Sequence, residues 1–299
     1  MRPPRPVRRG WQNDRPMTIL LALASAIVYG VADYAGGRST RTNPAPVVAV
    51  VGQLMSLVLI AVALVIARTP VPGASSLVWG AAGGLSGGIG LSAFYHALAN
   101  GAMSVVAPLT AVVSSVLPVV VGLASGERPR PIAYVGIALA IVAVALVSGA
   151  IGQRDRPTPK LVLAFAVFAG LGFGGLFVAL DRAADDSGVW PLLAARCGSI
   201  PLLLVLVTIG RRAVREQRPT WRGLRFAYVA GVLDMSANFL YLEATHGGLL
   251  SLVAVVGSLY PASTVLLAYG LDRERIHRPQ LVGMGVAAVA LAFVTLGRT

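Results

Sequence analysis

Ten apolar runs, each about 20 residues long, occupy most of this 299-residue chain. A helix of about 20 apolar residues crosses the hydrocarbon core of a bilayer. Lipid cannot pair open backbone groups, so only helices and closed barrels span a membrane. Barrel strands alternate apolar and polar residues, whereas VGIALAIVAVALV at 135–147 does not alternate. We therefore expect an all-α integral membrane protein with ten transmembrane helices, at Thr18–Gly37, Val47–Ala67, Leu77–Ala99, Met103–Ala124, Ile132–Ala150, Leu161–Leu180, Val189–Ile209, Phe226–Leu242, Leu249–Leu271 and Leu281–Leu296.

The charged residues support this class and exclude others. Only 12% of residues are charged, about half the fraction in soluble domains. The net charge of +13 comes from arginines between and beside the apolar runs, where they anchor helices to anionic headgroups. No folded basic face with interleaved aromatics accompanies them, so we expect the lipid bilayer as a partner and no nucleic acid. The single cysteine excludes an internal disulfide and a cysteine metal cluster, and we expect no metal or cofactor.

An internal repeat divides the chain into two halves. Glu274 follows Glu127 by 147 positions, and the same shift aligns Arg128 with Arg275, Gly136 with Gly283, and Gly84 with Gly231. The repeat predicts a tail at 1–17, repeat one at 18–150, a linker at 151–160 and repeat two at 161–299. Each repeat holds five spans. Because five is odd, the second repeat enters the membrane upside down, which gives two inverted five-helix repeats, an arrangement typical of secondary transporters.

Glycines in the third run predict close helix contacts. GGLSGGIG at 83–90 contains the pairs Gly83/Gly87 and Gly84/Gly88. Small residues four apart let the backbones of two helices approach one another.

Two longer stretches carry a resemblance to a known family. They are YHALANGAMSVVAPLTAVVSS at 95–115, followed by GERPRPIAYVGIALAIVAVAL, and YLEATHGGLLSLVAVVGSLYPASTVLLAYGLDRERI at 241–276. Over nearly its whole length the chain resembles the EamA-like ten-helix group of the drug/metabolite transporter superfamily. That family places a proline thirteen residues before a glutamate. Pro261 and Glu274 fit this pattern, whereas the first half has Ser114 in that place and Pro118 four residues later.

The resemblance implies that some helices line a substrate cavity and that others support it. The first, second, third, sixth, seventh and eighth would line a substrate cavity. The fourth, fifth, ninth and tenth would form the scaffold around it.

Three charged residues lie inside the ten runs: Asp33, Arg196 and Asp234. A charge at the centre of a spanning helix costs about 2.5–3.5 kcal/mol, so it normally faces a cavity or a partner. Asp234 shares one helix face with Asn238 and Tyr241, since their spacing is i, i+4, i+7. We expect this face to form a polar cavity wall, with Asp234 as a proton carrier or as the counter-ion of a cationic group. A buried hydrogen-bond network between helices is the alternative.

Arg196 keeps its charge and needs an anion or carbonyl groups nearby. It is expected either to bind an anionic substrate or to neutralise Asp234 from a neighbouring helix. Gln53 is its approximate repeat counterpart and is also polar and mid-span.

Two further positions have open interpretations. Asp33 shares a helix face with Tyr29 but lies toward the membrane boundary, so it either reaches to the interface or contacts substrate. His96 lies near a helix end and either serves in gating or proton coupling or is simply hydrogen-bonded.

These residues predict a secondary active transporter rather than an enzyme. It would export a small metabolite or amphipathic compound by alternating access, as a multi-pass protein of the plasma or inner membrane, driven by substrate or proton gradients. Amino acids, amines and sugars all remain open as substrates. The predicted substrate-binding residues are Tyr29, Gln53, Arg196, Asp234, Asn238 and Tyr241, with Asp234 and His96 as candidates for proton coupling.

Two rival functions follow from other features. DRAADD at Asp181–Asp186 is similar to the aspartate clusters with which membrane prenyltransferases hold magnesium and diphosphate, although those enzymes need two clusters and this chain has one. A membrane partner protein that transports nothing is the other rival. It predicts that Asp234→Asn leaves cellular activity intact.

Overall fold

The computed structural model describes residues 15–101, 103–147, 159–184, 186–211, 219–272 and 278–296. These residues form helices and no strand, as the sequence predicted. Most of the predicted tail and linker (1–14 and 151–158) lie outside the described residues. The helices are α1 (Arg15–Thr40), α2 (Ala45–Ala67), α3 (Ala74–Asn100), α4 (Met103–Ala124), α5 (Pro131–Val147), α6 (Lys160–Arg182), α7 (Trp190–Ile209), α9 (Trp221–Gly247), α10 (Leu250–Gly257), α11 (Tyr260–Asp272) and α12 (Arg278–Leu296).

Length and composition make this a multi-pass membrane protein. Among the described residues, seven of the ten expected spans are long and apolar enough to cross a bilayer: Met17–Thr40, Ala45–Ile66, Ala74–Asn100, Val105–Ala124, Lys160–Arg182, Trp190–Ile209 and Leu250–Asp272. A shorter apolar helix covers Pro131–Ala143. The outer faces are apolar as well. On α2, for example, Val58, Val62 and Val65 are 57%, 50% and 76% exposed, and their spacing places them on one helix face. Such a face suits contact with lipid chains.

One predicted span is interrupted. The run Leu249–Leu271 forms two helices, α10 and α11, with a turn at Ser258 and Leu259 between them. Pro261 explains the break, because proline has no N–H to donate to the preceding turn and its ring clashes with the carbonyl four residues earlier. The two short helices still form one span together.

Helices from the two halves pack in antiparallel pairs. Along α1, Thr18, Ser25 and Ser39 donate side-chain hydrogen bonds to the carbonyl oxygens of Gly247 (3.2 Å), Ala237 (2.8 Å) and Gly223 (3.0 Å) of α9, so α1 and α9 run in opposite directions. The pair α3 and α6 repeats this arrangement. Ser86 donates to the Gly172 carbonyl (2.9 Å), and Ser76 accepts from the Ala184 N–H (3.1 Å), just beyond the end of α6.

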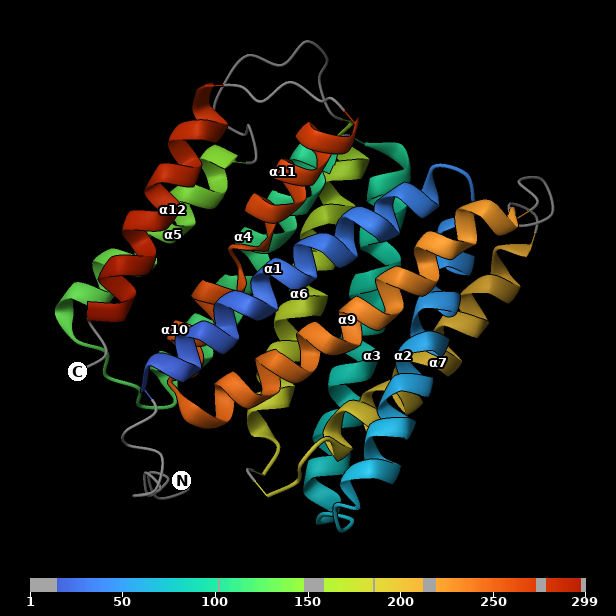
Figure 1. The fold of residues 1–299 in the computed structure, drawn as a ribbon, viewed down its shortest axis with the longest axis horizontal. Helices are drawn as coiled ribbons and strands as arrows, with labels where there is room; N and C mark the ends of the chain where they lie inside the picture. The colour runs from blue at the N-terminus through green and yellow to red at the C-terminus, as the bar shows by residue number, and fades with distance from the viewer. Residues whose placement is uncertain are drawn as a thin grey trace.

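The contacts of each half resemble those of the other. The contact of α1 with α9 corresponds to that of α6 with α3, and the contact of α2 with α9 corresponds to that of α7 with α3. Figure 1 shows α5 and α12 side by side at one edge of the molecule, next to α4, while α2 and α7 lie together near the opposite edge. Helices α1, α3, α6 and α9 fill the space between these edges.

Glycines allow the closest approaches between helices. Gly84 of α3 lies against the backbone carbonyl of Ala195 in α7, and its repeat counterpart Gly231 of α9 lies against the carbonyl of Gly52 in α2. A Cβ atom at either glycine would overlap that carbonyl oxygen. The repeat therefore places the same residue type at the same kind of contact in both halves.

Glu127 links the two halves. It follows α4, and its carboxylate accepts hydrogen bonds from the N–H groups of Leu250 (2.7 Å) and Ser251 (3.0 Å) at the start of α10. The first N–H groups of a helix lack partners within the helix, so this carboxylate caps α10. Its counterpart Glu274 lies outside the described residues.

Candidate functional site

A cavity lies among the central helices. It is lined by residues of α1, α2, α3, α6, α7 and α9, with single residues from α4 and α11. The three charged residues of the predicted spans, Asp33, Arg196 and Asp234, all line it. Most other lining residues are glycines, apolar residues and aromatics, so the few polar groups decide what the cavity binds.

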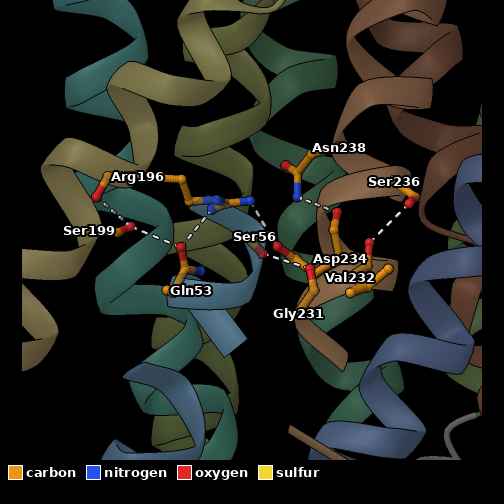
Figure 2. Close-up of polar contacts among 9 residues, drawn as sticks. All are labelled: Gln53, Ser56, Arg196, Ser199, Gly231, Val232, Asp234, Ser236 and Asn238. Atoms are coloured by element: carbon orange, nitrogen blue, oxygen red, sulfur yellow. Dashed lines mark hydrogen bonds and ion pairs between the residues drawn. The ribbon is translucent and has the colours of Figure 1, made fainter. Parts of the chain in front are cut away.

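Arg196 lies at the centre of the polar network in this cavity. Its Nη2 group donates to Asp234 Oδ2 at 2.9 Å, and its Nη1 group donates to Gln53 Oε1 at 2.8 Å. The three side chains come from α7, α9 and α2, and Figure 2 shows the guanidinium group between the other two. Arg196 is almost fully enclosed, with 4% of its side chain exposed, whereas Asp234 is 27% exposed. Of the two roles predicted for Arg196, this geometry favours the neutralisation of Asp234.

Neighbouring polar groups hold this pair in place. Ser199, one turn after Arg196, also donates to Gln53 Oε1 (3.0 Å), so this oxygen accepts from two donors on α7. Ser56 of α2 donates to the carbonyl of Gly231 in α9 (2.6 Å). Ser56 and Ser199 each lie about one helical turn after a predicted binding residue, Gln53 or Arg196. This spacing is the sequence feature that could have identified the two serines.

Four of the six predicted binding residues line the cavity: Tyr29, Gln53, Arg196 and Asp234. Asn238 does not. It is 1% exposed, and its Nδ2 group donates to the Asp234 carbonyl of its own helix (2.8 Å; Figure 2).

Tyr241 also lies outside the lining. It is fully buried and stacks on Phe177 of α6, with ring centroids 4.4 Å apart. Phe177 lines the cavity, so Tyr241 supports the wall from behind.

His96 is separate from this network. It is exposed near the end of α3, packs against Phe165 with ring centroids 4.4 Å apart, and does not line the cavity.

Tyr95 and Tyr260 line the cavity and were not among the predicted residues. Both are 5% exposed. Like Tyr29, each carries a hydroxyl group into an otherwise apolar run, and this is the sequence signal that identifies them.

Polar contacts close the helix bundle at both ends. Where α1 and α11 end, Arg38 in the last turn of α1 and Arg41 just after it pair with Asp272 at 2.7 and 3.3 Å. At the ends of α6 and α4, Arg182 donates to Ser125 Oγ at 2.8 Å. Ser125 and Asp272 are 147 positions apart and are therefore counterparts in the repeat. One end has two ion pairs, whereas the other has a hydrogen bond from a guanidinium group to an uncharged hydroxyl group.

The aspartate cluster forms no metal site in the part of the chain that can be described. Asp181 lies in the last turn of α6, Asp186 is exposed in the following turn, and Asp185 lies outside the described residues. No group of three or more His, Cys, Asp or Glu side chains that could hold a metal ion occurs among the residues searched.

Comparisons with known proteins agree with the predicted family. Residues 160–296 match the EamA-like transporter family, which confirms the resemblance to the drug/metabolite transporter superfamily. This is a family of membrane transporters of small compounds. No curated protein matches the chain.

Among solved structures, 27 chains match. One, described as a crystal structure of a protein, has a TM-score of 0.69 and 18% identity, and the match covers 93% of this chain and 96% of that chain. The similarity shows a shared fold.

Proposed function

We propose that the protein is a secondary active transporter that carries a small organic compound across the cell membrane by alternating access. One observation carries the proposal: the charged residues of the predicted membrane runs converge on one cavity between the two halves. Charged side chains inside a membrane are costly and mark substrate or ion pathways. The match to a family of transporters of small compounds supports the same function.

The arrangement of the halves supports alternating access. We propose that residues 18–150 and 161–299 are inverted repeats related by a two-fold axis in the membrane plane. Three findings support this relation: the antiparallel pairs α1/α9 and α3/α6, the corresponding helix contacts, and the matching contacts of Gly84 and Gly231. In such transporters one unit rocks against the other around a central site.

We assign coupling to Asp234. Its carboxylate is more exposed than the arginine that it pairs with, so a proton or a cationic group can reach it from the cavity. Binding there would weaken its bond to Arg196, and the guanidinium group would then depend on Gln53 alone. Gln53, Arg196 and Asp234 lie on three different helices, so a change at this pair acts on the packing of α2, α7 and α9 together.

Transport in proteoliposomes tests the proposal. We expect the purified protein to accumulate at least one compound from a panel of amines, amino acids and sugars, faster with a pH gradient than without. Asp234→Asn should abolish the response to the gradient. Ser236→Ala is the matched control, because Ser236 is on the same helix, is half-buried outside the cavity lining, and among the described residues bonds only to the carbonyl of Val232 one turn earlier (Figure 2).

Two outcomes would contradict the proposal at different levels. Full gradient dependence in Asp234→Asn would remove the proton-carrier role but leave transport. An absence of uptake for the whole panel, under any gradient, would remove transport itself. Export is our proposed direction, and vesicles of known orientation test it, since faster flux from the cytoplasmic face is expected.

A further inference from the structure

Asp33 is the acid in the cavity that has no partner among the described residues. It lies on α1 within the span Met17–Thr40 and lines the same cavity as Arg196 and Asp234. Within the described ranges its carboxylate has no hydrogen bond or ion pair. Asp234, by contrast, is bound to Arg196 at 2.9 Å. The sequence alone left Asp33 between the membrane interface and the substrate, and its place in the cavity wall favours the substrate.

The charges of the cavity are unequal. Two acids and one base line it, and the base is already shared between Asp234 and Gln53. With all three ionised, the cavity carries one net negative charge. An unbalanced charge inside a membrane protein is costly. A ligand with one positive charge would balance it, whereas a neutral molecule or a zwitterion would not.

Aromatic rings surround the free carboxylate. Tyr29, Tyr95 and Tyr260 line the same cavity as Asp33, from α1, α3 and α11. The faces of aromatic rings attract ammonium groups, and sites for organic cations combine such rings with a nearby negative charge. The Tyr29 hydroxyl is buried and unpaired among the described residues, so a hydrogen-bond donor or acceptor on a ligand could use it.

We infer that Asp33, Tyr29, Tyr95 and Tyr260 form a binding site for the ammonium group of an organic monocation. This inference rests on the proposed transport function and names the substrate class. Amino acids are not included in this substrate class, although Arg196 also lines the cavity. A substrate carboxylate would compete with Asp234 for the guanidinium group, whose Nη1 and Nη2 atoms already donate to Gln53 and Asp234.

Calorimetric titration of the purified protein in lipid nanodiscs at pH 7 tests the inference. The probes are 2-phenylethylamine, its neutral analogue 2-phenylethanol, and phenylalanine, which adds a carboxylate. We expect the amine to bind tightest. Asp33→Asn should weaken amine binding by roughly tenfold or more, because the loss of one partner of a close charge pair costs several kcal/mol. It should leave the weak binding of the alcohol unchanged.

Two further variants make the result specific. Asp33→Glu keeps the charge and should retain most of the amine binding, which separates loss of charge from loss of folding. Asp186→Asn removes an identical charge from an exposed turn outside the cavity and should change nothing. Equal affinity for amine and alcohol, equal affinity for amine and phenylalanine, or undiminished amine binding in Asp33→Asn would each overturn the inference. Because titration measures binding alone, these results leave the transport proposal to the flux experiment.

Discussion

Arg196 can keep its charge inside the membrane because two partners surround it. Gln53 and Asp234 each accept one hydrogen bond from the guanidinium group, and the side chain is only 4% exposed. Removing one member of a buried ion pair leaves the other charge unbalanced, which costs more than removing both. The pair therefore stabilises the packing of α7 against α9 only while it is complete.

A double-mutant cycle at this pair should be strongly non-additive. We expect Asp234→Asn and Arg196→Gln each to lower the free energy of unfolding by roughly 3 kcal/mol, and the double variant to lose no more than either single one. Unfolding in detergent micelles, followed by circular dichroism, measures this. Ser236→Ala should stay within about 0.5 kcal/mol of the parent protein. Losses that add up would show that the two side chains act independently.

Sequence reasoning identified the charged residues of the cavity more reliably than their surroundings. A charge in an apolar run is a strong signal, and Asp33, Arg196 and Asp234 all line the cavity. The position of Tyr241 was not predicted correctly from its spacing. Its spacing from Asp234 gives the helix face, but Phe177 of α6 stands between this ring and the cavity. The periodicity of α9 cannot predict that a side chain of another helix, here Phe177 of α6, covers Tyr241.

At the scale of helices, close backbone contacts position the cavity walls. Helix α3 approaches α6 through Gly83 and Gly87, and it approaches α7 through Gly84 and Gly88. Both glycine pairs were predicted from their spacing. The sequence could not predict which neighbour each pair would meet, because that depends on the order of helices around the bundle.

Alanine at Gly84 or Gly231 should force helices apart. We expect each substitution to lower the free energy of unfolding by about 1–3 kcal/mol, the usual cost of overpacking, because the new methyl group would overlap a backbone carbonyl that cannot move away. Thermal unfolding measures the effect. Gly270→Ala in α11 is the control, since no atom lies within 4 Å of its added Cβ, and alanine there should be neutral or stabilising by up to about 1 kcal/mol. Equal effects at all three glycines would contradict the packing argument.

For the whole molecule, the sequence predicted the all-helical membrane class and the order of the helices, while the division into two inverted repeats stays a prediction. Runs of about 20 apolar residues leave few alternatives in lipid, so ten of the helical segments were found from hydrophobicity alone, with α10 and α11 counted as one. The break before Pro261 was not predicted, because the apolar run continues across it. The contacts between halves were also beyond the sequence, since they join residues far apart along the chain, such as Ser86 and Gly172 or Ser25 and Ala237.

The polar contacts that close the two ends of the bundle differ in strength. This difference should bias which side of the cavity is open. Asp272 pairs with two arginines, whereas its uncharged counterpart Ser125 accepts one hydrogen bond from Arg182. Under alternating access, each contact must break when its end opens. The end at Asp272 should therefore remain closed for more of the time.

Exchanging the two contacts should reverse this bias. We expect Asp272→Asn to open the α1/α11 end, and Ser125→Asp to hold the α4/α6 end closed through an added ion pair with Arg182. Each change should shift the populations by about fivefold, since a partly exposed ion pair contributes up to about 1 kcal/mol. Leu91→Cys in the cavity wall, combined with Cys197→Ser, reports access to a membrane-impermeant maleimide added to one face of proteoliposomes. Both variants should move the labelling in the same direction, toward access from the α1/α11 end, and labelling that moves in opposite directions for the two variants would contradict the proposed gates.

The contact between Gln53 and Arg196 joins α2 and α7, the two helices that correspond to each other in the proposed repeat. Under the 147-residue shift, Gln53 corresponds to Ile200 and Arg196 corresponds to Ala49, so neither polar side chain is repeated in the other half. Covalent fusion of the two units allows them to differ in this way. The two sides of the cavity therefore differ in polarity. A bound substrate should adopt a single orientation and should cross the membrane with the same end first in every transport cycle.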